Sequence, residues 1–300
     1  MTSPIDDLHT VRDFLRYASS QFAASELYFG HGTDNVWDEA VQLVMRTLNL
    51  PLENNTLFLD ARLVREERQT ILERIKRRIS ERVPLAYLLK EAWFMGMPFH
   101  VDERVLVPRS PIGELLKNGL QPWLGDTPVN RILDLCTGSG CIGIGAASVF
   151  DEAEVVLSDI SAEALEVAQS NIAYHGVEDR VRAVRSDLFE NIDGQFDVIL
   201  SNPPYVDAED LAGMPQEYRH EPELGLAAGA DGLDLAHRIL TGALEHLSPE
   251  GLLIVEVGNS WVALDEAYPD LPLTWLDFEN GGSGVFLVTA EALRAWHQKT

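Results

Sequence analysis

The chain has 300 residues, of which 46% are hydrophobic and 24% charged, a balance typical of soluble globular enzymes. Its 48 acidic and 23 basic residues give a formal net charge of −25, which disfavours a nucleic-acid substrate because a negative surface repels phosphates. No apolar run approaches the roughly 18–20 residues that span a bilayer, and the acidic N-terminal residues lack a signal-peptide pattern, so we expect a cytoplasmic protein.

Residues 1–90 are predicted to form a small helical domain. The first long helix has one apolar face, made by Val11, Phe14, Leu15, Ala18 and Phe22 at helical spacing. A second helix is expected to begin near residue 33, with Thr33 or Asp34 as its cap. A third, over 64–82, places Ile71, Ile75 and Ile79 on one face. Its clustered basic residues are either a solvated helix face or a substrate contact.

Residues 91–111 change to short β-prone pieces with glycine and proline, which predicts a β-hairpin linker. From residue 112 short apolar runs alternate with helical patterns. We expect helices at 141–149, 161–174 and 232–247, and strands at 131–136, 154–159, 181–186, 196–201 and 251–257. These runs mostly lack a two-residue alternation, as strands covered by helices on both faces do. The last two runs, 273–278 and 281–290, are separated by a glycine turn, which predicts a final antiparallel pair.

A glycine-rich stretch, "DLCTGSGCIGIGAA", follows the first of these strands and opens a helix. Its glycines allow a sharp turn and close approach to a ligand at the helix N-terminus. Asp159 lies about 20 residues further on, where an acceptor for ribose hydroxyls belongs. These features suit both nicotinamide and adenosyl cofactors. Cys136 and Cys141 flank the loop without zinc spacing, and the histidines are scattered, so we predict two buried fillers and no metal site.

Two further carboxylates favour an adenosyl cofactor with an amino-acid portion. Asp134, at the end of the first strand, suggests a cationic or amino-bearing ligand nearby. Asp187, at the end of the third strand, could accept from an adenine amino group with Phe189 packed beside the ring, or cap a turn. With Asp159, three successive strands of the predicted sheet end in a carboxylate on the same edge, which favours a ligand site over three separate caps.

The segments "DLCTGSGCIGI", "LSDIS", "SDLF" and "NPPY" together resemble the seven-stranded S-adenosylmethionine-dependent methyltransferases over 112–300. This resemblance implies an α/β class with a Rossmann-like sheet, parallel except for an antiparallel final strand, and S-adenosylmethionine as cofactor. It places Asp134, Gly138 and Gly140 near the methionine portion, Asp159 at the ribose and Asp187 at the adenine. The other cofactor contacts that it implies are Thr137, Ile160, Leu188 and Asn202.

The motif Asn202-Pro203-Pro204-Tyr205 ends the strand at 196–201 with two residues that lack a backbone N–H. An amide nitrogen is a poor nucleophile, and acceptors aimed at both of its N–H bonds would activate and align it. The side-chain oxygen of Asn202 and the carbonyl of Pro203 could be those acceptors, held rigid by the prolines. Tyr205 could stack on the planar target group. The alternative is a proline-rich strand exit without chemistry.

Families with this motif modify either an exocyclic amine of a nucleic-acid base or a protein glutamine, and the net charge favours glutamine. The stretches at 94–116 and 221–234 resemble the protein-(glutamine) N-methyltransferases. Its release-factor branch usually has Pro-Arg-Pro-Asp-Thr-Glu where this chain reads "VPRSPIGELL". This stretch, residues 107–116, and the stretch at 28–44 together resemble the branch that modifies ribosomal protein L-three, a basic large-subunit protein.

The resemblance also implies a substrate pocket bordered by Phe99, Pro108 and Arg109, although Phe99 could be hairpin core and Arg109 a surface charge. It divides the chain into a helical substrate-recognition domain (1–90), a hairpin linker (91–111) and a methyltransferase domain (112–300). Three alternatives stay open: a release-factor glutamine methyltransferase, a nucleic-acid amine methyltransferase, and a catalytically silent binding module. The glycine- and proline-containing loop 206–224 is expected to be mobile without substrate.

Overall fold

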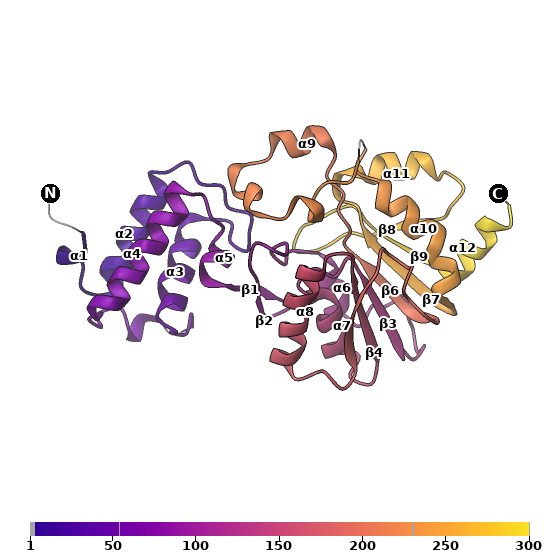
Figure 1. The fold of residues 1–300 in the computed structure, drawn as a ribbon, viewed down its shortest axis with the longest axis horizontal. Helices are drawn as coiled ribbons and strands as arrows, with labels where there is room; N and C mark the ends of the chain where they lie inside the picture. Colours follow the sequence, from indigo (N-terminus) through magenta and orange to yellow (C-terminus); the bar gives the residue numbers. More distant parts are fainter. Residues whose placement is uncertain (1–3, 54, 230, 300) are drawn as a thin grey trace. The chain divides into compact units, whose positions relative to one another are not determined.

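A computed structural model describes residues 4–53, 55–229 and 231–299 (Figure 1). The chain divides into two compact units. The first consists of Met1–Ala92 together with Pro215–His220, and the second of Trp93–Met214 and Glu221–Thr300. A short segment from the C-terminal half of the sequence is therefore part of the N-terminal unit. Within the described residues, no helix is both long and apolar enough to cross a membrane.

The first unit is built on the apolar faces of three helices, which confirms the helical pattern expected there. The five apolar residues predicted on the first face are all buried, together with Ile71 and Ile75, whereas Ile79 is only half-buried. The helices are α1 (Pro4–Asp7), α2 (Val11–Ala23), α3 (Val36–Thr47), α4 (Arg65–Ser80) and α5 (Leu85–Leu89), with 3-10 helices η1 (Asn55–Leu57) and η2 (Gln216–His220).

The start of α3 differs from the prediction by one or two residues. Asn35 is its N-cap, because an extended backbone lets the Asn35 side-chain oxygen accept the N–H of Asp38 at 2.9 Å. The hydroxyl of Thr33 donates instead to Glu39 inside the unit. The one-turn helix α5 was not expected, since its five residues are too few to show a period.

The second unit contains a seven-stranded sheet of order β5-β4-β3-β6-β7-β9-β8. Figure 1 labels β4, β3, β6 and β7 within it. The strands β3 to β7 pair in parallel and β9 is antiparallel to both of its neighbours, which confirms the predicted sheet and its antiparallel end. The strands are β3 (Arg131–Leu135), β4 (Glu154–Asp159), β5 (Val181–Arg185), β6 (Phe196–Ser201), β7 (Leu247–Glu256), β8 (Thr274–Trp275) and β9 (Val285–Thr289). The predicted hairpin is the two-stranded sheet of β1 (Glu91–Phe94) and β2 (Met97–His100).

Helices cover both faces of the large sheet, which explains why its strands lack alternation. Helices α7 and α8 pack on one face, and α10 and α12 on the other (Figure 1). The helices are α6 (Ile112–Lys117), α7 (Cys141–Val149), α8 (Ala162–His175), α9 (Ala208–Gly213), α10 (Asp234–His246), α11 (Trp261–Ala267) and α12 (Ala290–His297), with η3 (Glu223–Gly225) and η4 (Gly258–Ser260). Strand order reverses between β3 and β6, so a ligand crevice is expected beyond the carboxyl ends of these strands.

Candidate active site

A cavity lies at this switch point, wholly within the second unit. Its empty volume is about 860 Å³, counting the space that opens to solvent. Six of the residues predicted as cofactor contacts line it: Gly138, Asp159, Ile160, Asp187, Leu188 and Asn202. They come from the ends of β4 and β6 and from the segments after β3 and β5, so the sheet brings together residues that are far apart in the sequence.

Asp159, the last residue of β4, holds the glycine loop at the edge of the cavity. One carboxylate oxygen accepts the N–H of Gly138 at 2.9 Å and the other accepts the N–H of Ser161 at 2.9 Å. Burial raises the pKa of Asp159, although these N–H groups act in the opposite direction. Gly138 has a φ of +54°, and a Cβ placed there would meet no atom within 4 Å. The loop therefore leaves open space beside the Asp159 carboxylate.

Asp187 follows β5 and pairs across the cavity edge with Arg238 of α10, at 2.9 Å between Oδ1 and Nη2. Both residues line the cavity. Leu188, which adopts a left-handed φ of +48°, adds an apolar wall. Phe189, expected beside an adenine ring, instead stacks on His246 with 4.7 Å between ring centroids. Leu188, itself predicted as a cofactor contact, lines the cavity, whereas Phe189 is not among the lining residues.

Asp134 is fully buried under the glycine loop and is not among the residues that line the cavity. Its Oδ2 accepts the hydroxyl of Thr137 at 2.5 Å and the N–H of Gly143 at 2.9 Å. Burial raises the pKa of Asp134 to about 7. Thr137 and Gly140 also lie outside the lining, and Gly140 takes a φ of +83° at the N-terminus of α7. These three residues shape the loop, and their cofactor contacts stay a prediction.

The motif after β6 places Asn202 and Pro204 on the cavity wall, while Pro203 is buried and Tyr205 is not among the lining residues. The Tyr205 hydroxyl donates to Glu256, the last residue of β7, at 2.9 Å. Ser110 donates to the other oxygen of Glu256 at 2.6 Å. Burial raises the pKa of Glu256, although these two hydroxyls act against it. The motif is therefore braced from behind by a buried carboxyl group.

None of the three residues expected to border a substrate pocket lines this cavity. Phe99 is buried and packs edge-on against Phe94 in the hairpin core. Pro108 is buried as well. The next residue, Arg109, binds Glu221 with two hydrogen bonds of 2.6 and 2.7 Å. The residues of this linker that do line the cavity are Arg104, Val105 and Leu106.

Several residues of the site were missed in the sequence. Glu256 carries the same signal as Asp134 and Asp159, a carboxylate at the end of a strand on the ligand edge, and could have been found by it. Arg238 and Glu221 carry no local signal, because only the folded chain brings them to their partners. Cys136 was expected to be a buried filler, but it lines the cavity.

The residues present suit an adenosyl cofactor. Asp159 and Asp187 offer two separate carboxylates, as ribose hydroxyls and an adenine amino group require, and Ile160 and Leu188 offer apolar surface for a flat ring. The open space at Gly138 permits close approach of a ligand to the backbone.

Comparison with known proteins gave four matches that bear on this chain. Residues 115–215 match the family model "Methyltransferase small domain". A ribosomal protein uL3 glutamine methyltransferase of Francisella tularensis is 52% identical over 291 residues, covering 96% of this chain and 93% of its own. One of Neisseria gonorrhoeae is 50% identical over 288 residues, covering 96% of each chain. The catalytic domain of hMettl16, solved in complex with the MAT2A 3′UTR hairpin 6, superposes with a TM-score of 0.53 over 74% of this chain and 80% of that chain. At 16% identity it shows the fold alone.

Proposed function

The chain belongs to the family of ribosomal protein uL3 glutamine methyltransferases, and from this membership we propose that it methylates the side-chain amide nitrogen of one glutamine in ribosomal protein uL3. The cofactor is S-adenosylmethionine. The observation that carries the proposal is the position of Asn202, on the wall of the cavity that Asp159 and Asp187 also line. A candidate amide-binding residue and two candidate cofactor-binding carboxylates thus share one cavity.

The cofactor is held by residues at the strand ends. Asp159 accepts from the ribose hydroxyls, Asp187 accepts from the adenine amino group, and Ile160 and Leu188 flank the ring. Gly138 and Gly140 let the backbone approach the methionine portion, with Asp134 and Thr137 supporting their loop. When bound, S-adenosylmethionine supplies a methyl group activated by its attachment to a positively charged sulfur.

The catalytic residues act on the glutamine amide. The two N–H groups of the glutamine amide donate hydrogen bonds to the side-chain oxygen of Asn202 and to the carbonyl of Pro203. These bonds orient the amide nitrogen and raise its electron density. Tyr205 offers a planar face beside the motif. No strong general base is needed, since a methylated amide cation loses its proton readily to nearby acceptors or water.

The helical domain of residues 1–90 is proposed to recognise the protein substrate, the hairpin of 91–111 to link it, and residues 112–300 to carry the chemistry. Phe99, Pro108 and Arg109 would then act on the substrate side indirectly, through the hairpin core and through Glu221. A basic ribosomal protein is a suitable partner for a chain with a net charge of −25. Cytoplasmic location follows from this substrate and is part of the proposal.

The decisive experiment compares ribosomal proteins from cells with and without this gene by mass spectrometry. We expect one methyl group to be lost from a glutamine of uL3. Loss from a peptide-release factor instead would assign the chain to the sibling branch. With purified protein, Asn202→Ala should lower methyl transfer by about two orders of magnitude or more and leave cofactor affinity nearly intact. Retained turnover in that variant would contradict the mechanism.

A further inference from the structure

The segment that follows the catalytic motif leaves the second unit and is built into the first. Residues 206–214 and 221–225 belong to the second unit, whereas Pro215–His220 belongs to the first. The segment begins and ends beside β6, since Val206 pairs with Ala227 and its N–H donates to Leu226 at 2.9 Å. It is therefore a closed excursion of the chain whose middle part is held by the helical unit.

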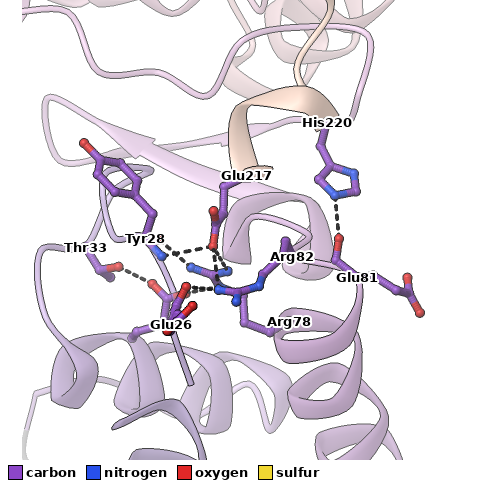
Figure 2. Close-up of polar contacts among 9 residues, drawn as sticks. Glu26, Tyr28, Thr33, Arg78, Glu81, Arg82, Glu217 and His220 are labelled. Carbon is purple, nitrogen blue, oxygen red and sulfur yellow. Dashed lines mark hydrogen bonds and ion pairs between the residues drawn. The ribbon is translucent and has the colours of Figure 1, made fainter. Parts of the chain in front are cut away.

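Glu217 is the centre of this attachment, as Figure 2 shows. Its Oε1 accepts from Nη1 of Arg78 at 3.1 Å and from the N–H of Tyr28 at 3.0 Å. The side chains of Arg78 and Glu217 are each only 2% exposed. Arg78 also donates to Glu39 at 2.5 Å and to the carbonyl of Tyr28 at 2.7 Å, so each of its three guanidinium nitrogens donates a hydrogen bond. Two donors, Arg78 and the N–H of Tyr28, thus hold the same oxygen of the Glu217 carboxylate in place.

The neighbours of Glu217 add to the attachment. The ring of Tyr218 lies 4.5 Å from that of His31 and 5.7 Å from that of Tyr28, measured between centroids. The imidazole of His220 lies 2.8 Å from the carbonyl of Glu81 (Figure 2). Three of the four residues 217–220 thus contact the rest of the helical unit through their side chains.

A second buried carboxylate, four residues later, holds the same segment to the methyltransferase unit. Glu221 accepts two hydrogen bonds from Arg109 and the N–H of Val107 at 3.0 Å. The residues that follow at once, Pro222, Leu224 and Gly225, line the cofactor cavity with Asn202. The wall of the cavity is therefore separated by only a few residues from the attachment at Glu217.

We propose that Glu217 is a positioning residue for methyl transfer: by binding Arg78 it fixes residues 215–220 within the helical unit, and through the continuous chain it constrains the cavity wall at 222–225 when the protein substrate is bound. This inference rests on the proposed function. Removing one partner of a buried ion pair is destabilising where it leaves a buried charge unpaired, but Arg78 would keep its ion pair with Glu39 after Glu217 is replaced. The experiment must therefore distinguish a positioning role of Glu217 from a contribution of the ion pair to the stability of the helical unit.

The experiment compares wild type with Glu217→Ala, Glu217→Gln and, as the matched control, Asp210→Asn, an exposed carboxylate of the same segment that lies outside the cavity wall. Amide hydrogen exchange of the full chain reports on 206–225 and, separately, on α2 and α4. Methyl transfer to purified uL3 gives kcat and KM, and calorimetry gives the cofactor Kd without uL3. Exchange and cofactor affinity do not depend on activity.

In Glu217→Ala we expect exchange in 206–225 to rise about tenfold or more while α2 and α4 stay protected. The kcat/KM for uL3 should fall about tenfold or more, and the cofactor Kd should stay within about twofold of wild type. The exchange and the kcat/KM of Glu217→Gln should lie between those of wild type and Glu217→Ala, because an amide oxygen can still accept hydrogen bonds from Tyr28 and Arg78. The control should match wild type in every measurement.

Two results would overturn the proposal. One is unchanged exchange and turnover in both Glu217 variants. The other is increased exchange of α2 and α4 along with the segment in both variants, which would make the pair a stability element of the helical unit. Failure of wild type to methylate uL3 would instead overturn the proposed function, and the exchange data would still decide whether Glu217 anchors the segment.

Discussion

The phenolic oxygen of Tyr205 lies 2.9 Å from a carboxylate oxygen of Glu256, which joins the catalytic motif to the end of β7. Glu256 is buried and is not among the residues that line the cavity, so its contact with the motif is the one through Tyr205. Because β7 is the direct neighbour of β6 in the sheet, this contact relates the motif after β6 to a rigid strand. The motif is therefore held in place by this hydrogen bond to β7 as well as by its prolines.

Glu256→Gln is expected to lower kcat about tenfold to a hundredfold, since a displacement of the motif by a fraction of an ångström misaligns the amide acceptors. The cofactor Kd should change by less than about twofold, because Asp159 and Asp187 are untouched. Steady-state kinetics and calorimetry measure the two quantities. Glu250→Gln, an exposed glutamate of the same strand, is the control. Equal losses of turnover and cofactor affinity would argue against a role through Tyr205.

Gly258→Ala should lower turnover because it would displace the ring of Tyr205, a residue of the catalytic motif. A Cβ at Gly258 would lie 2.5 Å from a ring carbon of Tyr205, so the ring must move. The φ of +50° adds about 1–2 kcal/mol of backbone strain. Gly281→Ala is the matched control, because its φ of +82° is equally unfavourable but nothing lies within 4 Å. We expect both variants to melt at lower temperature and only Gly258→Ala to lose turnover at a temperature where both are folded.

Asp187→Ala is expected to raise the cofactor Kd about tenfold, the effect of losing one hydrogen bond to a charged acceptor. If Asp187 reads the adenine amino group, the preference for S-adenosylhomocysteine over its inosine analogue should disappear in this variant. Arg238→Ala should keep that preference, since it removes only the partner of Asp187 at 2.9 Å. Titration of both ligands measures the preference, and its survival in Asp187→Ala would refute the assignment.

The stability of the protein should depend on pH through Asp134. Burial raises the pKa of this group to about 7 from an ordinary value of 3.8, so the folded protein retains a proton that the unfolded chain has lost. Its contribution to the free energy of unfolding is therefore present at low pH and decreases as pH rises towards 7. Urea denaturation of wild type and Asp134→Asn between about pH 5.5 and 8 should show the difference between them falling up to about pH 7. The exposed Asp151→Asn should show no such slope.

Association with uL3 should be sensitive to salt. An enzyme with a net charge of −25 attracts a basic protein over a distance that ions screen. Between about 50 and 300 mM NaCl we expect KM for uL3 to rise several-fold with little change in kcat or cofactor Kd. A KM that is independent of salt would show that recognition depends on short-range contacts alone.

Most of the sheet could be predicted from the sequence because its signals are local. Apolar runs, the glycine turn before β9 and the carboxylates at strand ends are properties of a few consecutive residues, and the helix expected at 141–149 is α7. Parallel strands present their carboxyl ends at one edge, so the strand pattern was enough to group Asp134, Asp159, Asp187 and Asn202. The last three line the cavity, whereas Asp134 is buried under the glycine loop. The one-turn helix α5 and the cap of α3 were missed, because so few residues show no period.

The tertiary structure alone decided which distant residues meet. Composition, periodicity and motif spelling determined the α/β architecture, the glycine loop and the Asn-Pro-Pro-Tyr strand exit. They could not show that Glu217 pairs with Arg78, 139 residues away, or that Glu221 pairs with Arg109, 112 residues away. Such pairs depend on how the closed chain excursion at 206–227 packs, and packing is a property of the whole fold that no short window of sequence contains.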